Sequence, residues 1–549
     1  MIDQLNHLFA EALRGLDAAA GQAAKWEIPK DAALGDLSST VAFKLAASQR
    51  RAPAAVAEDL ATTLRAHVKG SSIGSWIDRI EATRGFVNVF LSAPALAHVV
   101  RQVRRLGPRY GTSRAESSSR VLVEFVSANP TGPLSVAHGR QAVVGDALVR
   151  LLRSQGASVT TEYYLNDEGR QIDLLGQSLR ARYEEQLGRS AAIPEEGYHG
   201  AYVLESAAKL VAEQQDRLLR QPPEWFVQRG MVEQLARIKE DLARFGLVFE
   251  SWTSQRDLRI SGKVDRALEA LRQRDVLYEA DGALWFASTK FGDDKDRVIR
   301  KQGGELTYLA PDIAYHQLKF TRGYTRLINL WGPDHHGYIA RVRAALSALG
   351  LPADHLIIRI VQLVTLSRQG KPVPMSKRQG EFVTFRQVLD EIGADATRFF
   401  FLMRTMESHL DVDLELAKSQ SQENPVYYVQ YAHARICSIL AHAKSRLPWW
   451  ARVGALRLPL LDQPEERLVL RHVFQYPLVV RLCAQALEPH GLTVYLQRLA
   501  EAFHVFYSKH RVVSDDAARS RARIALVHAV RQVLANGLSL LGVSAPQRM

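Results

Sequence analysis

Hydrophobic and polar positions along this 549-residue chain predict regions of different architecture, the first of them a small α/β domain. The opening residues, MIDQLNHLFAEALRGL, carry apolar side chains at helical spacing, and two further helical segments are split at Pro53. The stretch RIEATRGFVNVFLS then alternates like a strand, with Gly85 interrupting it. A polar linker rich in Ser, Gly and Arg follows at 106–120. Residues 1–110 are therefore expected to form a separate α/β domain.

From Val121 the pattern changes to strand, loop, helix and strand. VLVEFV is suited to a buried strand, an amphipathic helix is expected from Gly139 to Arg153, and SVTTEYYL has the pattern of the next strand. Such a unit, with a right-handed crossover, implies parallel strands. Further strand signals occur in ALWFAS, LTYLAPDIAY, RLINLWG and HLIIRIVQLVTLS. Residues 120–384 are expected to form a parallel-sheet α/β domain, with a mostly helical insertion near 170–275.

The last third of the chain is expected to be all-helical. Apolar residues recur at helical spacing in YVQYAHARICSILAHA and RIALVHAVRQVLANGLSLLG, which places residues 385–549 in a helical domain. The net charge of +13 is concentrated here, because residues 421–549 hold 16 lysines and arginines against 8 acids. This excess favours a polyanionic partner such as a nucleic acid. An arginine-rich composition caused by codon usage is the alternative, and charge alone leaves both open.

Composition also bears on where the protein works. No stretch approaches 18 consecutive apolar residues, so no membrane association is expected. The N-terminus lacks the basic start and cleavage site of a signal peptide. Cys437 and Cys483 are the only cysteines, too few for a disulfide framework or a cysteine metal site. A cytoplasmic, reduced protein is expected.

The loop NPTGPLSVAH, between the first strand and helix of the central domain, is the first candidate site. Open parallel sheets bind ligands beyond the carboxyl ends of their strands. The following helix would offer unpaired N–H groups and a partial positive charge, which suit a phosphate. Pro130 and Pro133 hold the loop extended, and Gly132 permits close backbone approach. The loop is neither a Walker A nor a dinucleotide motif, and on physical grounds it predicts a nucleotide-phosphate site.

The stretch EFVSANPTGPLSVAHGRQAVVGDAL resembles the signature loop of class I aminoacyl-tRNA synthetases, most closely that of the arginyl-tRNA synthetases. In that family the loop ends in His-Ile/Val-Gly-His, and its histidines hold the ATP phosphates. The matching residues here are Ser135, Val136, Ala137 and His138, so serine and alanine replace the first histidine and the glycine. Serine can donate a hydrogen bond but brings no imidazolium charge, and a degenerate loop is the alternative. The resemblance implies a catalytic role for His138 and implies ATP binding by Pro130, Gly132, Pro133, Ser135, Ala137, His138 and Gly139.

GKPVPMSKRQGEFVTF, at 370–385, resembles the Lys-Met-Ser-Lys loop of the same class. Alone, Met-Ser-Lys is explained by a charged surface turn, and its weight comes from following the strands of the central domain. The first lysine position holds Pro374, and Arg368 or Lys371 is a candidate for the missing charge. The resemblance implies that Met375, Ser376 and Lys377 bind ATP and that Lys377 is catalytic, neutralising charge that develops on pyrophosphate.

A guanidinium is recognised by carboxylates and planar acceptors in a confined pocket. LTYLAPDIAYH places Tyr308 and Asp312 four residues apart, which is one face if that segment is helical. A zinc site at His335 and His336 is disfavoured, because adjacent histidines suit chelation poorly and no cysteine accompanies them. No metal site is expected. The resemblance implies L-arginine as substrate, bound by Glu124, Ser127, Asn129, Tyr308, Asp312, His335 and His336.

The resemblance covers nearly the whole chain, from IPKDAALGDLSSTVAFKLA to LANGLSLLGVSAPQRM. It implies that tRNA(Arg) is the partner and that Tyr431, Arg435 and Met549 contact it. FHVFYSKHR, at 503–511, interleaves aromatic and basic residues, which suits either stacking on unpaired bases or a helix core, and both remain open.

The implied fold is a class I Rossmann-type parallel-sheet core with an N-terminal α/β domain and a C-terminal all-α anticodon-binding domain. The implied activity is ATP-dependent formation of arginyl-adenylate and its transfer to the 3′ end of tRNA(Arg). ATP would arrive with Mg²⁺, no tightly bound cofactor is expected, and the family is mostly monomeric. The rival hypotheses are a non-catalytic tRNA-binding paralogue and a class I ligase for another substrate.

Overall fold

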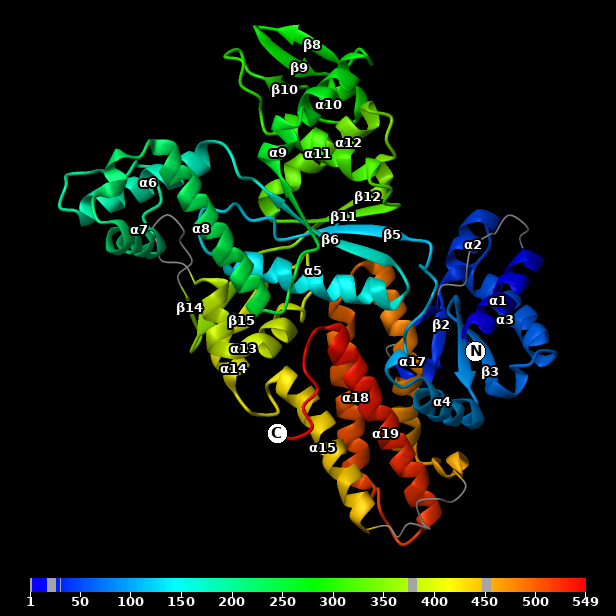
Figure 1. Cartoon of the computed structure of the whole chain (residues 1–549). Coiled ribbons are helices and arrows are strands. Elements are labelled where there is room, and N and C mark those ends of the chain that lie inside the picture. The colour runs from blue at the N-terminus through cyan, green and yellow to red at the C-terminus, as the bar shows by residue number, and fades with distance from the viewer. Residues whose placement is uncertain (1, 17–25, 30, 374–382, 447–455) are drawn as a thin grey trace.

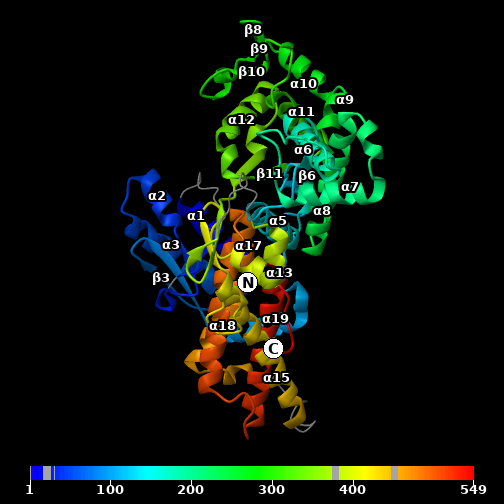
Figure 2. The ribbon, with the colours of Figure 1, turned by 90° about the vertical axis from the view of Figure 1, so that its left-hand side faces the viewer.

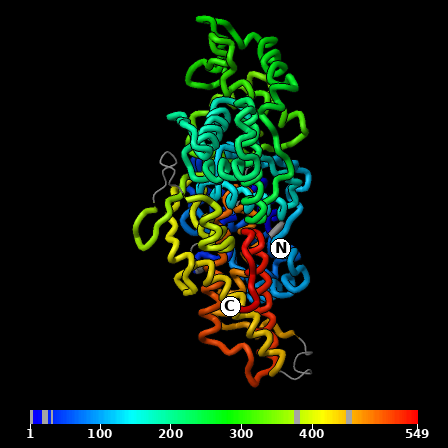
Figure 3. Tube along the Cα trace, turned by 60° about the vertical axis from the view of Figure 1, so that its left-hand side comes forward, coloured from blue at the N-terminus to red at the C-terminus, as the bar shows by residue number. Residues whose placement is uncertain are grey.

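The computed structural model describes residues 2–16, 26–29, 31–373, 383–446 and 456–549 (Figure 1). The molecule is elongated (Figure 3), with a small antiparallel sheet at one end and a helical bundle at the other (Figure 1). The N-terminal domain lies beside the bundle, and a five-stranded parallel sheet occupies the middle (Figures 1 and 2). No helix among the described residues is long and apolar enough to cross a membrane.

The N-terminal domain is a four-stranded antiparallel sheet, in the order β1-β2-β4-β3, packed against helices. The single strand expected across Gly85 is a hairpin of two strands, because Arg84 and Gly85 both adopt positive φ and turn the chain. Its elements are α1 (Ile2–Leu16), β1 (Trp26–Glu27), β2 (Leu37–Ser39), α2 (Val41–Gln49), α3 (Pro53–Lys69), β3 (Ile77–Thr83), β4 (Phe86–Leu91) and α4 (Ala93–Leu106).

The central sheet has the order β12-β11-β5-β6-β7 and is parallel throughout, as the strand–helix–strand pattern predicted. Successive residues of β5 face opposite layers: Val123 packs in the core with α5, and Leu122 packs with Leu346 of α12. Helix α5 lies on one side of the sheet, and α11 and α12 lie on the other (Figures 1 and 2). The elements are β5 (Arg120–Glu124), α5 (Val136–Ser154), β6 (Ser158–Leu165), β7 (Ser251–Ser254), α11 (Leu309–Thr321), β11 (Arg326–Trp331), α12 (Ile339–Ala348) and β12 (Leu356–Ile360).

Two excursions leave the central sheet. Helices α6 (Arg170–Gln186), α7 (Ala201–Gln214) and α8 (Pro223–Arg244) form an arm before β7 returns the chain to the sheet beside β6. The range expected to be an insertion, 170–275, therefore contains a strand of the central sheet as well as helices. The second excursion consists of α9 (Gln255–Ile260), α10 (Lys263–Arg272) and an antiparallel sheet of β8 (Leu277–Ala280), β9 (Ala283–Phe286) and β10 (Arg297–Arg300).

The strand expectation for LTYLAPDIAY is wrong, because this segment runs into α11. Leu309, Ala310, Ile313 and Ala314 are all buried, which is the spacing of a helix that turns one face to the core. Helix α11 packs across the strands that carry the candidate arginine-binding residues. This placement fixes the geometry of the site.

The C-terminal region is a helical bundle preceded by a small three-stranded sheet, β14-β13-β15. The expectation that 385–549 is all-helical is wrong for residues 410–413, because this segment pairs parallel to β13. Tyr110 donates a hydrogen bond to the carbonyl of Val473 (2.9 Å), which joins the end of the N-terminal domain to the bundle. The elements are β13 (Val364–Arg368), β14 (Lys371–Pro372), α13 (Phe385–Phe401), β15 (Leu410–Asp413), α14 (Leu414–Lys418), α15 (Pro425–Arg446), α17 (Pro464–Ala486), α18 (His490–Lys509) and α19 (Ala517–Leu540).

Candidate active site

The chain turns sharply where β5 ends, and this turn builds one wall of the site. Val126 and Ser127 have φ of 69° and 37°, which non-glycine residues rarely adopt, and such strain is concentrated at functional sites. The turn directs the Ser127 hydroxyl back to Glu124, where it donates to Oε1 at 3.1 Å. The hydroxyl oxygen of Ser127 accepts from the backbone N–H of Tyr164 on β6 (3.1 Å). Two predicted arginine-binding residues, Glu124 and Ser127, are thus held together at the carboxyl end of β5, beside β6.

The helical arm contacts the signature loop directly. The side chain of Asn129 donates to Gln171 of α6 (2.6 Å), and the Tyr202 hydroxyl of α7 donates to the carbonyl of Thr131 (2.8 Å). A Cβ on Gly132 would lie 2.9 Å from the hydroxyl oxygen of Tyr202. The close approach that Gly132 permits in this structure is therefore made by Tyr202. No pattern along the chain indicates this contact, because it joins residues about 70 positions apart.

Ser135 and His138 form the N-terminus of α5. Ser135 has the extended conformation of an N-cap residue, and its backbone N–H donates to Nδ1 of His138 (3.2 Å). A neutral imidazole that accepts at Nδ1 carries its proton on Nε2. That tautomer can donate to a phosphate oxygen. Pro130 is buried, whereas Pro133 and Ala137 are partly exposed beside this helix end.

The two signature segments are joined through the first residues of α13. The backbone N–H of Phe385 donates to the carbonyl of Leu134 (2.7 Å), and Ser135 forms a β-bridge with Thr384. A Cβ on Gly139 would lie 2.3 Å from the ring of Phe385, so this glycine allows α5 and α13 to pack closely. The end of the second signature segment is thereby fixed against the first.

The predicted ATP-binding residues Met375, Ser376 and Lys377 lie outside the described residues, as does Pro374. Of the two candidates for the missing charge, Arg368 already forms an ion pair with Glu391 at 2.7 Å. Lys371 is exposed at the start of β14.

A row of polar side chains crosses the central sheet beneath α11. Glu124 pairs in register with Glu162 on one side and with Asn329 on the other. Glu124 accepts from the ammonium of Lys319 (2.5 Å), and Glu162 accepts from the hydroxyl of Tyr315 (2.8 Å). Parallel strands place matched residues side by side, so the register creates this cluster.

Asp312 lies in the first turn of α11, above this row. The pKa of Asp312 is raised to about 7, mainly by burial and next by the negative charge of Glu124. The positive charge of Lys319 lowers this pKa, but by less. His316, one turn later, is buried and accepts from Asn329 (2.9 Å), and burial lowers its pKa to about 3. His316 is therefore neutral. Asp312 can gain or lose its proton near neutrality, which suits a group that receives a cationic ligand.

The remaining predicted arginine-binding residues lie at the rim. Tyr308 is 54% exposed and immediately precedes α11. His335 and His336 are exposed on a 3-10 turn, where the His335 ring packs against Trp331. Tyr338, at the end of that turn, is close enough to Asp312 for the carboxylate to contribute to the raised pKa of its hydroxyl, after burial.

Sequence reasoning missed the residues that hold the carboxylates in place. Lys319 and Tyr315 follow Asp312 by seven and three positions, the spacing of one helical face, so a helical assignment of this segment would have indicated them. Glu162 and Asn329 could be found only through strand register. Among the described residues, no group of three or more His, Cys, Asp or Glu side chains is arranged to hold a metal ion.

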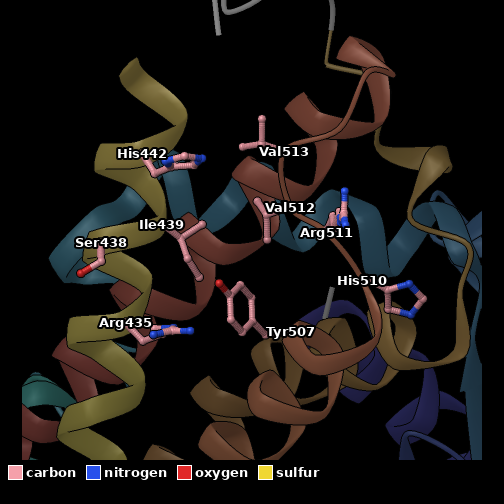
Figure 4. A pocket seen from close by; sticks show the side chains of 9 residues that line it. All are labelled: Arg435, Ser438, Ile439, His442, Tyr507, His510, Arg511, Val512 and Val513. Carbon is pink, nitrogen blue, oxygen red and sulfur yellow. The ribbon is translucent and has the colours of Figure 1, made fainter. Parts of the chain in front are cut away.

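A second candidate site lies in the helical bundle, where a pocket of about 510 Å³ opens between α15 and α18 (Figure 4). Arg435 lies over the ring of Tyr507 at 5.1 Å, and Tyr431 stacks on His504. Phe503 and Phe506 are fully buried and belong to the core, so of the three aromatics in FHVFYSKHR only Tyr507 lines the pocket. The pocket is lined by Arg435, Ser438, Ile439, His442, Tyr507, His510, Arg511, Val512 and Val513.

The C-terminal tail returns to α15. The His433 ring N–H donates to the carbonyl of Pro546 (2.8 Å), and Gln430 donates to the carbonyl of Ser544 (3.0 Å). Met549 is 51% exposed at the end of this tail. The tail, Tyr431 and Arg435 are thus brought to one helix, but Met549 itself does not line the pocket.

Comparisons with known proteins agree along the chain. The arginyl tRNA synthetase N terminal domain matches residues 3–91, the catalytic domain of tRNA synthetases class I (R) matches 101–214 and 250–418, and the DALR anticodon binding domain matches 429–549. Arginine–tRNA ligases from Syntrophotalea carbinolica and Geobacillus kaustophilus are 45% and 46% identical, each over 95% of this chain and 94% of the relative.

Solved structures agree with these matches. A putative arginyl-tRNA synthetase from Campylobacter jejuni is 34% identical over 84% of this chain and 100% of its own, with a TM-score of 0.77. The arginyl-tRNA synthetase of Thermus thermophilus shares the fold with a TM-score of 0.79 at 22% identity, over the full length of both chains. This chain belongs to the arginyl-tRNA synthetases, the class I ligases that use ATP to attach arginine to tRNA(Arg).

Proposed function

We propose that the arginine side chain binds between Asp312 and Glu124, with Tyr308 closing over it. A guanidinium is planar and donates hydrogen bonds in a fork that matches a carboxylate. The observation that carries this proposal is the position of Asp312, which faces Glu124 and has its pKa raised to about 7 by burial and by that neighbour. A guanidinium between the two carboxylates removes their repulsion. Ser127 and Asn129, at the end of β5, are assigned to the α-amino and carboxylate groups, and His335 and His336 to the rim.

The ATP phosphates are assigned to the loop 130–139 and the N-terminus of α5. The arginine carboxylate attacks the α-phosphorus, pyrophosphate leaves, and a ribose hydroxyl of the tRNA end then attacks the carbonyl carbon of the adenylate. His138 is suited to donate from Nε2 to a phosphate oxygen, because Ser135 occupies its Nδ1. Lys377 supplies a cation for the departing pyrophosphate. These groups stabilise developing charge and need form no covalent intermediate. Mg²⁺ enters with ATP as part of the substrate.

The pocket between α15 and α18 is proposed to take an unpaired base of the anticodon loop. Arg435 and Tyr507 offer a cation and an aromatic face at its mouth, which suit a phosphate and a base. Tyr431, and Met549 on the tethered tail, extend this surface along α15. The +13 net charge of the chain supports binding of a polyanion.

We further infer that the protein is a monomer and that it works in the cytoplasm. Both of its cysteines are free thiols.

The test is arginine-dependent exchange between ATP and pyrophosphate, with and without tRNA(Arg). Wild type is expected to exchange when tRNA is present, as members of the family generally do. Asp312→Asn should raise the KM for arginine, whereas Lys377→Ala should lower kcat and leave tRNA affinity unchanged. Exchange by Asp312→Asn at an unchanged arginine KM would show that the pocket lies elsewhere. Sedimentation of the purified protein tests the monomer.

A further inference from the structure

The ammonium of Lys319 is enclosed between α11 and the central sheet. Its side chain is 0% exposed, and Nζ lies 2.5 Å from Oε2 of Glu124 and 2.9 Å from Oδ1 of Asn329. The ring of Tyr315 lies on a further side, with its centroid 4.2 Å from Nζ. Burying an ion pair costs desolvation energy and is weak evidence for stability. A role in ligand binding accounts better for its position.

In the ion pairs beneath α11, each sheet carboxylate has its own cation, from α11 or from the residue that directly follows it. Glu124 is paired with Lys319, and Glu162 with Arg322. Among the described residues, no lysine or arginine lies within ion-pairing distance of Asp312. The two pairs are neutral, and the ionised cluster therefore has one net negative charge, on Asp312. The arginine side chain has one positive charge.

We propose that Lys319 is a positioning residue that determines specificity by charge: its ammonium compensates and orients the Glu124 carboxylate, so that the pocket accepts one further cation. Oε2 is occupied by Lys319, and Oε1 accepts from Ser127 and keeps lone-pair capacity for a ligand. This inference rests on the proposed arginine pocket. It adds a residue that acts through Glu124 rather than by touching arginine.

Loss of the Lys319 ammonium changes the protonation of the carboxyl groups in the pocket. Glu124 and Asp312 would then be an uncompensated pair of carboxylates, and the like charge of Glu124 disfavours ionisation of Asp312. Because Lys319 favours the ionised form of Asp312, its removal shifts the pH dependence of arginine binding to higher pH. The other titratable groups that face this cluster, from all elements packed on it, are Glu162, Tyr164, Tyr308, Tyr315, His316, Arg322 and Tyr338.

The experiment compares Lys319→Met with Lys319→Arg by pyrophosphate exchange with saturating tRNA. Lys319→Met should raise the arginine KM at least about tenfold, because it leaves a buried charge unpaired. The ATP KM should stay within about twofold, and the inflection in arginine KM should move to higher pH. Lys319→Arg keeps the charge and should restore most of the affinity. An unchanged arginine KM and pH profile in Lys319→Met would overturn the inference.

The matched control is Arg523→Met, which breaks a similarly buried pair with Glu466 (2.7 Å) in the bundle. It should lose stability without changing the arginine KM. Asp312→Asn distinguishes the proposed arginine pocket from the proposed role of Lys319. If Asp312→Asn leaves the arginine KM unchanged, the pocket assignment itself fails. If Asp312→Asn raises the KM and Lys319→Met does not, only the role of Lys319 fails.

A measurement on wild type covers the case in which Lys319→Met does not fold. Calorimetry of arginine binding, in buffers with different ionisation enthalpies, counts the protons released. Below the pKa of Asp312 the count should approach about one, because Glu124 is ion-paired with Lys319 and Asp312 is the carboxyl that loses a proton. A count near two would show that the ion pair between Glu124 and Lys319 does not form in solution.

Discussion

The backbone N–H of Ser135 donates to Nδ1 of His138 across 3.2 Å. The residue that replaces the family's first histidine thus fixes the tautomer of the second, and the proton of a neutral imidazole resides on Nε2. The hydrogen bond comes from the main chain, so it survives any substitution of the Ser135 side chain that preserves the backbone. In the proposed mechanism, His138 is therefore the side chain at this helix end that donates to the ATP phosphates.

Replacing His138 should therefore slow adenylate formation strongly. His138→Ala is expected to lower kcat for pyrophosphate exchange by about a hundredfold, since one preorganised donor is lost in the transition state. His138→Gln retains an N–H donor on a side chain of similar length and should recover part of that loss. His355→Ala removes an exposed histidine before β12 and serves as the control. Equal rates for wild type and His138→Ala would remove this residue from the proposed role.

Gly139 is constrained by packing, and this makes a second prediction. Its Cβ would lie 2.3 Å from the ring of Phe385, so Gly139→Ala must displace α13 or the ring. The overpacking should cost about 1–3 kcal/mol in free energy of unfolding, more than the roughly 1 kcal/mol of helix propensity that alanine adds. Thermal or denaturant unfolding measures the difference.

The control for that variant is Gly15→Ala in α1, where nothing lies within 4 Å of the added Cβ and only propensity acts. The double variant Gly139→Ala/Phe385→Leu should regain part of the lost stability, because a smaller side chain makes room. Failure of Phe385→Leu to relieve Gly139→Ala would mean that the clash lies elsewhere.

The sequence predicted the elements whose signals are local. SVTTEYYL corresponds to β6 in full, and the helix expected from Gly139 to Arg153 is α5, which begins three residues earlier, at Val136. Strand β15 was missed because it is four residues long and pairs with β13, about 45 residues earlier. LTYLAPDIAY contains β-branched and aromatic residues, which favour a strand locally. Tertiary packing against the sheet overrides that preference, and the segment forms a helix.

The same limit applies to the candidate site. Asp312 and Glu124 were predicted from their chemistry and from the family resemblance, but the roles of Lys319 and Glu162 depend on which strands lie side by side. Strand order and register are non-local, so a pattern along the chain contains little information about them. The contact between Tyr202 and Gly132 is of the same kind, since it joins a separate helical arm to the loop.

Arg435 provides a test of the pocket in the bundle. Arg435→Ala should weaken tRNA binding by about 1–3 kcal/mol if a base stacks beside Tyr507, and should reduce the salt dependence of binding by about one phosphate contact. The KM for arginine at saturating tRNA should not change. Filter binding at several salt concentrations measures both effects.

Arg272→Ala is the control for Arg435→Ala, because this exposed arginine lies on α10 at the opposite end of the molecule (Figure 1). Equal losses in the two variants would show that general charge, rather than the pocket, is responsible.

In the proposed arginine site, the proton on Asp312 is expected to favour the folded state and to oppose arginine binding. Its pKa rises from the ordinary 3.8 to about 7 on folding, so between these values the folded state binds a proton that the unfolded state does not. Stability contributed by this proton is full below about pH 4 and is lost as pH rises through 7. Asp312→Asn cannot ionise and should unfold at a higher temperature than wild type above pH 7, with no advantage at pH 4.

Arginine affinity should have the opposite pH dependence to stability, because the guanidinium needs the ionised carboxylate. The arginine KM of wild type should fall by about tenfold per pH unit as pH approaches 7 from below and then level off. Asp312→Asn should bind arginine weakly at every pH and show no such inflection. Asp281→Asn, in an exposed turn between β8 and β9, is the matched control for loss of one carboxylate. If Asp312→Asn gains stability and loses arginine affinity, Asp312 is a carboxylate that binds the ligand and destabilises the folded state. Loss of both would instead make it an ordinary structural residue of α11.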